Sequence, residues 1–128
     1  MRYLAVAAGA VLGANLRFIV ANWSADQWGV DFPYGTFIVN VSGAFVIGLF
    51  LAFLQHGSAA QLNPLWRLFF ATGFLGGYTT FSAYTWEALT LAENGAWLRG
   101  AAYVVGSNVL GFLGVWLGAQ VAGAFERN

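Results

Sequence analysis

A short run of hydroxyl and aromatic side chains interrupts an otherwise apolar segment of the chain. Thr79, Thr80 and Ser82 carry hydroxyl groups, which can donate and accept hydrogen bonds. Phe81 and Tyr84 follow at a spacing of three, so on a helix their rings share one face. We expect this run to form the functional site. The alternative is that the hydroxyls bond back to their own helix and mark only a packing face.

Two glycines, Gly76 and Gly77, stand just before this run, where a membrane helix would normally carry large apolar side chains. A glycine pair can interrupt a helix and free backbone carbonyls. Such a break is tolerated within a membrane only where it is buried in protein or lines a polar cavity. We therefore expect a break in the helix near residues 76–80.

The composition is that of a membrane protein. Of the 128 residues, 59% are hydrophobic and 8% are charged, whereas about 25% are charged in a typical soluble domain. The net charge is +0 and lysine is absent, which argues against a nucleic-acid partner. With no cysteine and one histidine, a transition-metal site is not expected. No nucleophile, base and orienting acid converge, so we do not expect an enzyme.

Four apolar segments approach the length of about 20 residues that a bilayer requires. They cover residues 3–20, 34–54, 65–91 and 97–125, and together form a single domain over residues 1–128. The first apolar stretch continues to Arg17 and beyond, which favours a retained helix over a cleaved signal peptide. The expected fold is therefore an all-α, multi-pass protein of the cell membrane with four transmembrane helices, the third broken. Trp23 and Trp28 are expected in the loop that follows the first helix, at the membrane interface.

Several polar side chains lie within these segments and leave alternatives open. Thr36 and Asn40 share one face of the second segment, where the amide either joins helices or donates to a permeating anion. Arg17 either snorkels, forms an ion pair or faces a polar vestibule. Glu87 is either a vestibule group or an interfacial carboxylate.

Stripes of small and polar residues mark the first and fourth segments. Gly9 and Gly13 lie four residues apart and predict close contact between helices. The fourth segment carries a stripe that suits a helix contact, a pore wall or both, formed by Tyr103, Ser107, Gly111, Gly114 and Gly118.

The arginines give almost no orientation signal. With four spans, Arg2, Arg67 and Arg127 fall on one side of the membrane, and Arg17 and Arg99 fall on the other. The positive-inside rule needs a clear excess to fix an orientation. We therefore hypothesise dual topology, in which two oppositely oriented copies pair about an axis in the membrane plane.

The chain resembles the small Fluc (CrcB) fluoride channels of bacteria and archaea over nearly its whole length. The resemblance rests on the motifs Gly13-Ala14-Asn15-Leu16-Arg17, Gly35-Thr36-Phe37-Ile38-Val39-Asn40 and Gly73-Phe74-Leu75-Gly76-Gly77-Tyr78-Thr79-Thr80-Phe81-Ser82. It implies an antiparallel homodimer with two fluoride pores, each lined by both subunits. It also implies passive fluoride export that relieves fluoride toxicity, and the lack of a P-loop agrees with passive conduction.

The resemblance further implies which residues act. The fluoride-pore residues would be Thr36, Asn40, Thr80, Phe81, Ser82, Tyr84, Tyr103 and Ser107. Tyr84 departs from the family pattern, in which phenylalanine is usual. Backbone carbonyls of Gly76 and Thr79 would hold a structural Na⁺ at the dimer interface, and Arg17 and Glu87 would line the vestibules. Fluoride, sodium, lipid and a second copy of the chain are thus the expected partners.

Two rival functions remain. A small dual-topology multidrug exporter would need a membrane-embedded carboxylate, and residues 3–20 contain none. A structural subunit of a larger membrane complex would explain the small-residue stripes, but it would not explain the polar and aromatic run that starts at Thr79.

Overall fold

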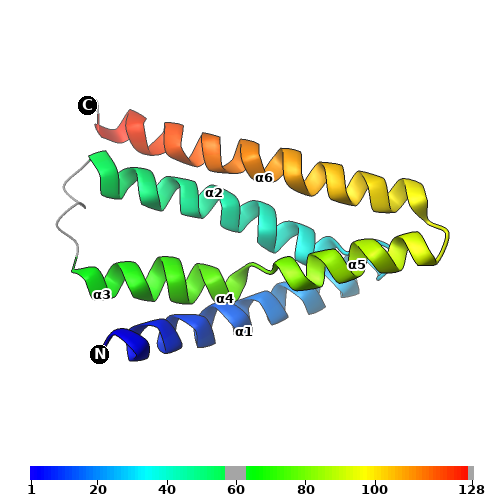
Figure 1. The fold of residues 1–128 in the computed structure, drawn as a ribbon, viewed down its shortest axis with the longest axis horizontal. Helices are drawn as coiled ribbons and strands as arrows, with labels where there is room; N and C mark the ends of the chain where they lie inside the picture. The colour runs from blue at the N-terminus through cyan, green and yellow to red at the C-terminus, as the bar shows by residue number, and fades with distance from the viewer. Residues whose placement is uncertain (57–62, 127–128) are drawn as a thin grey trace.

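The computed structural model describes residues 1–56 and 63–126, and within these ranges the chain is helical and contains no strand. The helices are α1 Arg2–Trp28, α2 Tyr34–His56, α3 Pro64–Arg67, η2 Leu68–Leu75, α4 Gly76–Tyr78, α5 Phe81–Glu93 and α6 Trp97–Glu126. The helices α3, η2 and α4 follow one another without interruption, and α5 continues beyond a short extended link (Figure 1). The prediction of an all-α protein is confirmed.

Three helices are long and apolar enough to cross a membrane. They cover Arg2–Trp28, Tyr34–Gln55 and Trp97–Phe125. The remaining segment, from α3 to α5, runs beside them but is divided by the link, so the arrangement is consistent with four spans of which the third is broken. The start of α1, the end of α6 and the start of α3 lie at the same end of the bundle (Figure 1). Arg127, which was expected there, lies outside the described residues.

The first helix is longer than the sequence suggested. Trp23 and Trp28 were expected in a loop, yet α1 continues to Trp28, where the two indole rings meet edge to face at 5.0 Å. Neither glycine nor proline occurs between Gly13 and Gly29, so nothing in this stretch ends the helix. Gly29 ends it with a φ of 77°, a conformation that glycine adopts readily.

Glycines let the helices approach backbone to backbone. A Cβ atom at Gly13 would collide with the carbonyl of Phe74 on η2, and one at Gly118 of α6 would collide with the carbonyl of Phe45 on α2. Small residues permit this approach in membrane bundles. The close contacts predicted from the glycine stripes are therefore confirmed for α1 with the third span and for α6 with α2.

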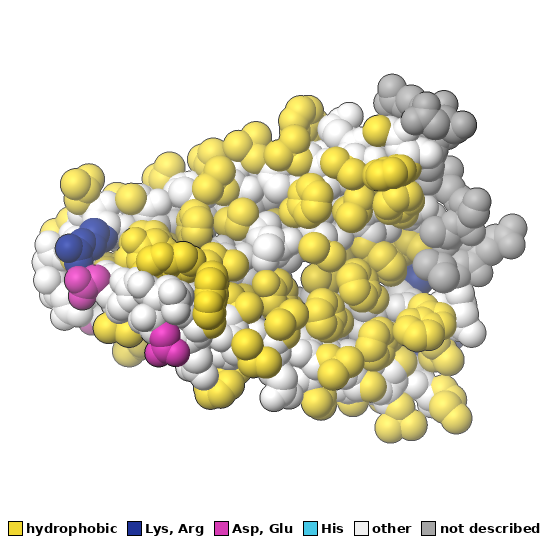
Figure 2. All heavy atoms as spheres, turned by 180° about the vertical axis from the view of Figure 1, so that it is seen from behind, with side chains coloured by type: hydrophobic (Ala, Val, Ile, Leu, Met, Phe, Trp, Pro, Cys, Tyr) yellow, Lys and Arg dark blue, Asp and Glu magenta, His cyan; other side chains and the backbone are white. Residues whose placement is uncertain are grey.

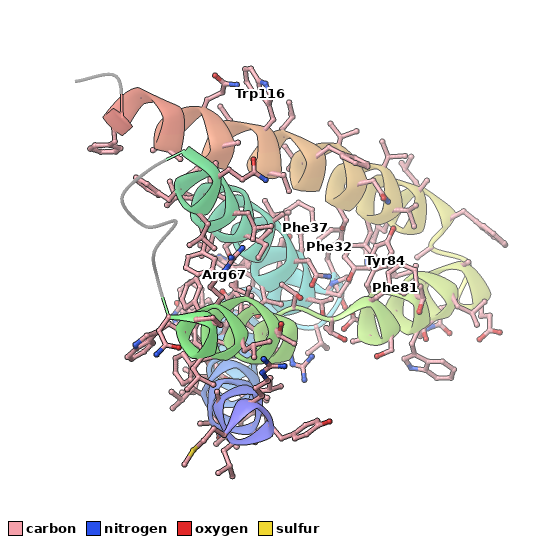
Figure 3. The ribbon with its side chains drawn as sticks, turned by 60° about the vertical axis from the view of Figure 1, so that its left-hand side comes forward. Phe32, Phe37, Arg67, Phe81, Tyr84 and Trp116 are labelled. Atoms are coloured by element: carbon pink, nitrogen blue, oxygen red, sulfur yellow. The ribbon has the colours of Figure 1, made fainter. Side chains whose placement is uncertain are left out.

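The outer surface is largely hydrophobic (Figure 2). Phe112 and Trp116 of α6 expose 78% and 57% of their surface, and Trp116 points away from the bundle (Figure 3). Charged side chains gather at the end of the molecule where α5 meets α6 (Figure 2). Arg99 and Asp31 form an exposed ion pair there, with 3.9 Å between Nη1 and Oδ2. This distribution is that of a protein embedded in lipid, with charges at the membrane surface.

Candidate functional site

The break in the third span lies at two threonines. Thr79 has φ −85° and ψ 161°, and Thr80 has φ −152° and ψ 125°, so both are extended. The glycines that were expected to cause the break behave differently. Gly76 is helical, with φ −64° and ψ −32°, and a Cβ at Gly77 would lie 2.7 Å from the Ala10 carbonyl oxygen of α1. Gly77 therefore serves close packing, while the interruption follows it.

A π-helix leads into the break. The segment η2, Leu68–Leu75, has the wider turns of this rare helix type, which is frequent at functional sites. The π-helix was not predicted, because the segment is apolar apart from Thr72 and its periodicity carries no signal that separates a π-helix from an α-helix.

Asn40 of α2 binds both backbone groups of Thr80 at the break. Its Nδ2 donates to the Thr80 carbonyl at 2.9 Å, and its Oδ1 accepts from the Thr80 N–H at 2.8 Å. One side chain thus satisfies both backbone groups of an extended residue within the bundle. Of the two roles left open for Asn40, this geometry is that of an amide joining two segments, and one of its two amide hydrogens remains for a further acceptor.

Two backbone carbonyls lose their helical partners at the break. Because the Thr80 N–H donates to Asn40, it does not reach the carbonyl of Gly76 four residues earlier. The Ala83 N–H donates to the Thr80 hydroxyl at 3.3 Å. It therefore does not donate to the Thr79 carbonyl, which would be its acceptor in a continuous helix. Arg17 Nη1 donates to that Thr79 carbonyl at 3.2 Å. Arg17 is therefore bound to the break inside the bundle and does not snorkel.

Glu87 joins three helices beyond the break. Its Oε1 accepts from the Thr36 hydroxyl of α2 at 2.8 Å, and its Oε2 accepts from the Tyr103 hydroxyl of α6 at 2.7 Å. Tyr103 is fully buried. Glu87 thus lies between helices, where two hydroxyl donors compensate its partial burial.

Aromatic side chains continue from the break along α5. Phe81 exposes 77% of its surface, and its ring centroid lies 5.8 Å from that of Tyr84 (Figure 3). The Tyr84 ring lies 5.2 Å from that of Tyr103. The Tyr84 hydroxyl accepts a hydrogen bond of 2.8 Å from Nδ2 of Asn108 on α6. Asn108 was not among the predicted site residues, although an amide within an apolar helix was a signal for it.

Two cavities adjoin the break. One of about 540 Å³ is lined by residues that include Arg17, Thr36, Thr80, Ser82 and Glu87. The other, about 430 Å³, is lined by residues that include Asn40, Gly76, Thr79, Thr80 and Phe81. Thr80 borders both cavities, so the extended link lies between two spaces, each with some polar groups in its wall.

Comparison with known proteins identifies the family. Residues 4–119 match the family described as CrcB-like protein, Camphor Resistance (CrcB). The chain belongs to this family. A CrcB relative from Roseiflexus sp. (strain RS-1) is 47% identical over 122 residues, which cover 95% of this chain and 97% of the relative. A relative from Acidobacterium capsulatum is 46% identical over 121 residues, 94% of this chain and 95% of the relative.

Both CrcB relatives carry the name fluoride-specific ion channel FluC. The resemblance drawn from the sequence motifs is therefore confirmed. Together with helices of membrane length, it makes this CrcB-like chain a multi-pass membrane protein. Its named relatives are ion channels and not enzymes, as expected.

The structure of this CrcB-like chain gathers most of the residues that the motifs singled out. The residues that line one of the two cavities or bond to Glu87 are Arg17, Thr36, Asn40, Gly76, Thr79, Thr80, Phe81, Ser82, Glu87 and Tyr103. The ring of Tyr84 packs against the rings of Phe81 and Tyr103. Ser107 stands apart: its Oγ is buried and has no hydrogen-bond partner among the described residues. A buried hydroxyl without a partner can accommodate a further polar group.

Proposed function

We propose that this chain forms a fluoride channel that lets the ion leave the cell passively and so relieves fluoride toxicity. The observation that carries the proposal is the break at Thr79 and Thr80, with uncharged donors and aromatic rings beside it, in a chain 47% identical to a protein named fluoride-specific ion channel FluC. The sequence has no nucleotide-binding P-loop, which agrees with passive conduction down a gradient.

Fluoride is a small and strongly hydrated anion, so a dry pore must replace its water with hydrogen-bond donors. The hydroxyls of Thr80 and Ser82 and the remaining amide hydrogen of Asn40 can supply them. Phe81 adds the positive edge of its ring without a full charge. Such binding is strong enough for entry and weak enough for exit.

The other proposed pore residues differ in whether their hydroxyl groups already have hydrogen-bond partners. Thr36 and Tyr103 now donate their hydroxyl hydrogens to Glu87, so an anion beside them would compete with that carboxylate. Ser107 has a buried hydroxyl without a partner among the described residues, and the hydroxyl is free to donate to a passing ion. Arg17 and Glu87 border the larger cavity with opposite charges, which suits a vestibule that is close to neutral.

We also propose that two copies pair in opposite orientations. Phe81 exposes 77% of its surface beside a cavity that includes Asn40 and Gly76. A second copy would cover both the ring and this cavity, and each pore would then be lined by both copies. Arg17 is bound within the bundle, and of the other arginines in the described part of the chain Arg2 and Arg67 would lie on one side and Arg99 on the other. An excess of one arginine leaves both orientations accessible.

The freed carbonyls at the break fit a structural Na⁺ between the two copies. Gly76 and Thr79 offer hard oxygen atoms that have lost their helical partners, and a second copy would double the set. No carboxylate belongs to this set, which favours a monovalent ion over Ca²⁺. Arg17 uses one lone pair of the Thr79 carbonyl and leaves the other for the ion. When bound, the ion would supply a charge that holds the two breaks together. Assembly and conduction that are unchanged when Na⁺ is replaced by a bulky organic cation would contradict this role.

Anion flux from liposomes tests the proposed function. Purified protein is reconstituted into vesicles loaded with potassium fluoride or potassium chloride, and efflux is followed with ion-selective electrodes after addition of valinomycin. We expect fluoride to leave and chloride to stay. Equal loss of both anions, or a fluoride loss no faster than from protein-free vesicles, would overturn the channel. Proton-driven cation export by the same vesicles would support the exporter instead.

A further inference from the structure

Asn108 places an amide on an exposed and otherwise apolar face of α6. Asn108 is exposed, and its neighbours Val105, Val109 and Phe112 expose 61%, 50% and 78% of their surface. A polar side chain on such an apolar face is costly in a membrane and is kept where it has partners or a function. Nδ2 of Asn108 donates to the Val104 carbonyl at 2.7 Å and to the Tyr84 hydroxyl at 2.8 Å. Both amide hydrogens can therefore be used.

The bond from Asn108 determines how the Tyr84 hydroxyl can act. A phenol has one hydrogen to donate and lone pairs that accept. Because Asn108 donates to the oxygen, the phenol hydrogen must point away from the amide. No acceptor for that hydrogen occurs among the described residues. The ring itself is held by Phe81 and Tyr103, whose centroids lie 5.8 Å and 5.2 Å away.

We propose that Asn108 is a positioning residue that presents the Tyr84 hydroxyl as a hydrogen-bond donor to the permeating anion. The inference rests on the proposed function and adds a donor to the ring edges and hydroxyls described above. An oxygen that accepts a hydrogen bond from an amide also becomes a better donor, because bonds in a chain polarise one another. Tyr84 thus contributes through its hydroxyl as well as its ring, and the hydroxyl contributes only when Asn108 orients it.

A double-mutant cycle tests this dependence. Initial rates of fluoride efflux are compared for the native chain, Tyr84→Phe, Asn108→Leu and the double variant. Leucine approximates the size of asparagine and cannot donate. We expect each single change to slow efflux by roughly three- to tenfold, the effect of one lost hydrogen bond. We expect the double variant to be no slower than Tyr84→Phe alone, since the amide acts through the hydroxyl.

A control separates this effect from a general loss of polar groups. Thr90 also lies on α5, and its hydroxyl bonds only to the Trp86 carbonyl of the same helix, at 2.9 Å. Thr90→Val should conduct like the native chain. If Asn108→Leu is poorly folded by size-exclusion chromatography, Asn108→Asp replaces it. This change keeps the shape but turns the donor into an acceptor that captures the phenol hydrogen, so its cost in efflux should shrink in the Tyr84→Phe background.

The outcomes are distinct. A conducting native chain in which the two single effects multiply would overturn the inference and leave the proposed function intact. The same holds if Asn108→Leu conducts at the native rate. A native chain that passes no fluoride would overturn the proposed function, and the inference with it.

Discussion

The two halves of the third span are held in place by different interactions. The first half, from α3 to α4, lies against α1 through glycines, so that backbone contacts backbone at Gly13 and Gly77. The second half, α5, is held by hydrogen bonds between side chains, through Glu87 to α2 and α6 and through Tyr84 to Asn108. Close packing gives the first half one fixed position. Hydrogen bonds leave the second half with polar groups that can exchange partners with an ion.

The largest effect is expected where the packed half is overfilled. In Gly13→Leu, a bulky side chain would replace a hydrogen atom that faces the Phe74 carbonyl, so α1 and η2 could not approach. We expect loss of folded protein, measured as recovery of a monodisperse peak in detergent. Gly111→Leu is the matched control, because no atom lies within 4 Å of a Cβ built there. Equal recovery of both variants would show that the packing of α1 is not critical.

A second large effect is expected at the junction between the halves. Asn40→Leu leaves the Thr80 N–H and carbonyl without their partners, at about 1–3 kcal/mol for each unsatisfied group. We expect fluoride efflux to fall by roughly a hundredfold, which is the kinetic equivalent of about 2.7 kcal/mol. Asn40→Asp, which keeps an acceptor for the N–H, should retain more activity than Asn40→Leu. The opposite order would mean that Asn40 does not act through Thr80.

A moderate effect is expected in the hydrogen-bonded half. Glu87→Gln leaves one carbonyl oxygen for two hydroxyl donors, so either Thr36 or Tyr103 loses its acceptor. The free energy of unfolding should fall by about 1–3 kcal/mol, measured as a lower melting temperature in detergent. If melting is unchanged, these bonds do not hold α5.

The smallest effect is expected at the membrane surface. Arg99 and Asp31 are 59% and 88% exposed, and their charged atoms lie 3.9 Å apart. Exposed pairs of this kind contribute about 0–1 kcal/mol. Arg99→Ala should therefore leave both melting and fluoride efflux close to native. A large loss of either would assign this end of the bundle a role that its geometry does not suggest.

The sequence predicted the parts of the molecule that depend on local composition. Hydropathy located the helices that lie in lipid, and the glycines at 9 and 13 predicted the contact of α1 with the third span. The break was expected near residues 76–80, but it was attributed to Gly76 and Gly77 instead of Thr79 and Thr80. Thr80 is held extended by Asn40, a residue of another helix. A contact of this kind depends on how α2 and α4 pack and has no signature within the segment itself.

The same limit applies to the candidate site. Asn40, Thr36 and Glu87 were recognised as polar residues in apolar segments, but their pairing could not be read from their spacing. The end of α1 was placed too early because tryptophan suits an interface whether or not the backbone is helical there. Asn108 was passed over because its partner, Tyr84, belongs to a different span.

One consequence of the break concerns the dipoles of the helices that meet there. The continuous segment from α3 to α4 ends at Tyr78, and α5 begins at Phe81. A helix carries a partial negative charge at its C-terminal end and a partial positive charge at its N-terminal end, each about half an elementary charge. Two extended residues therefore separate a region that favours a cation, beside Gly76 and Thr79, from one that favours an anion, beside Phe81. A single interruption of the backbone suffices to create two polar environments of opposite sign within one span.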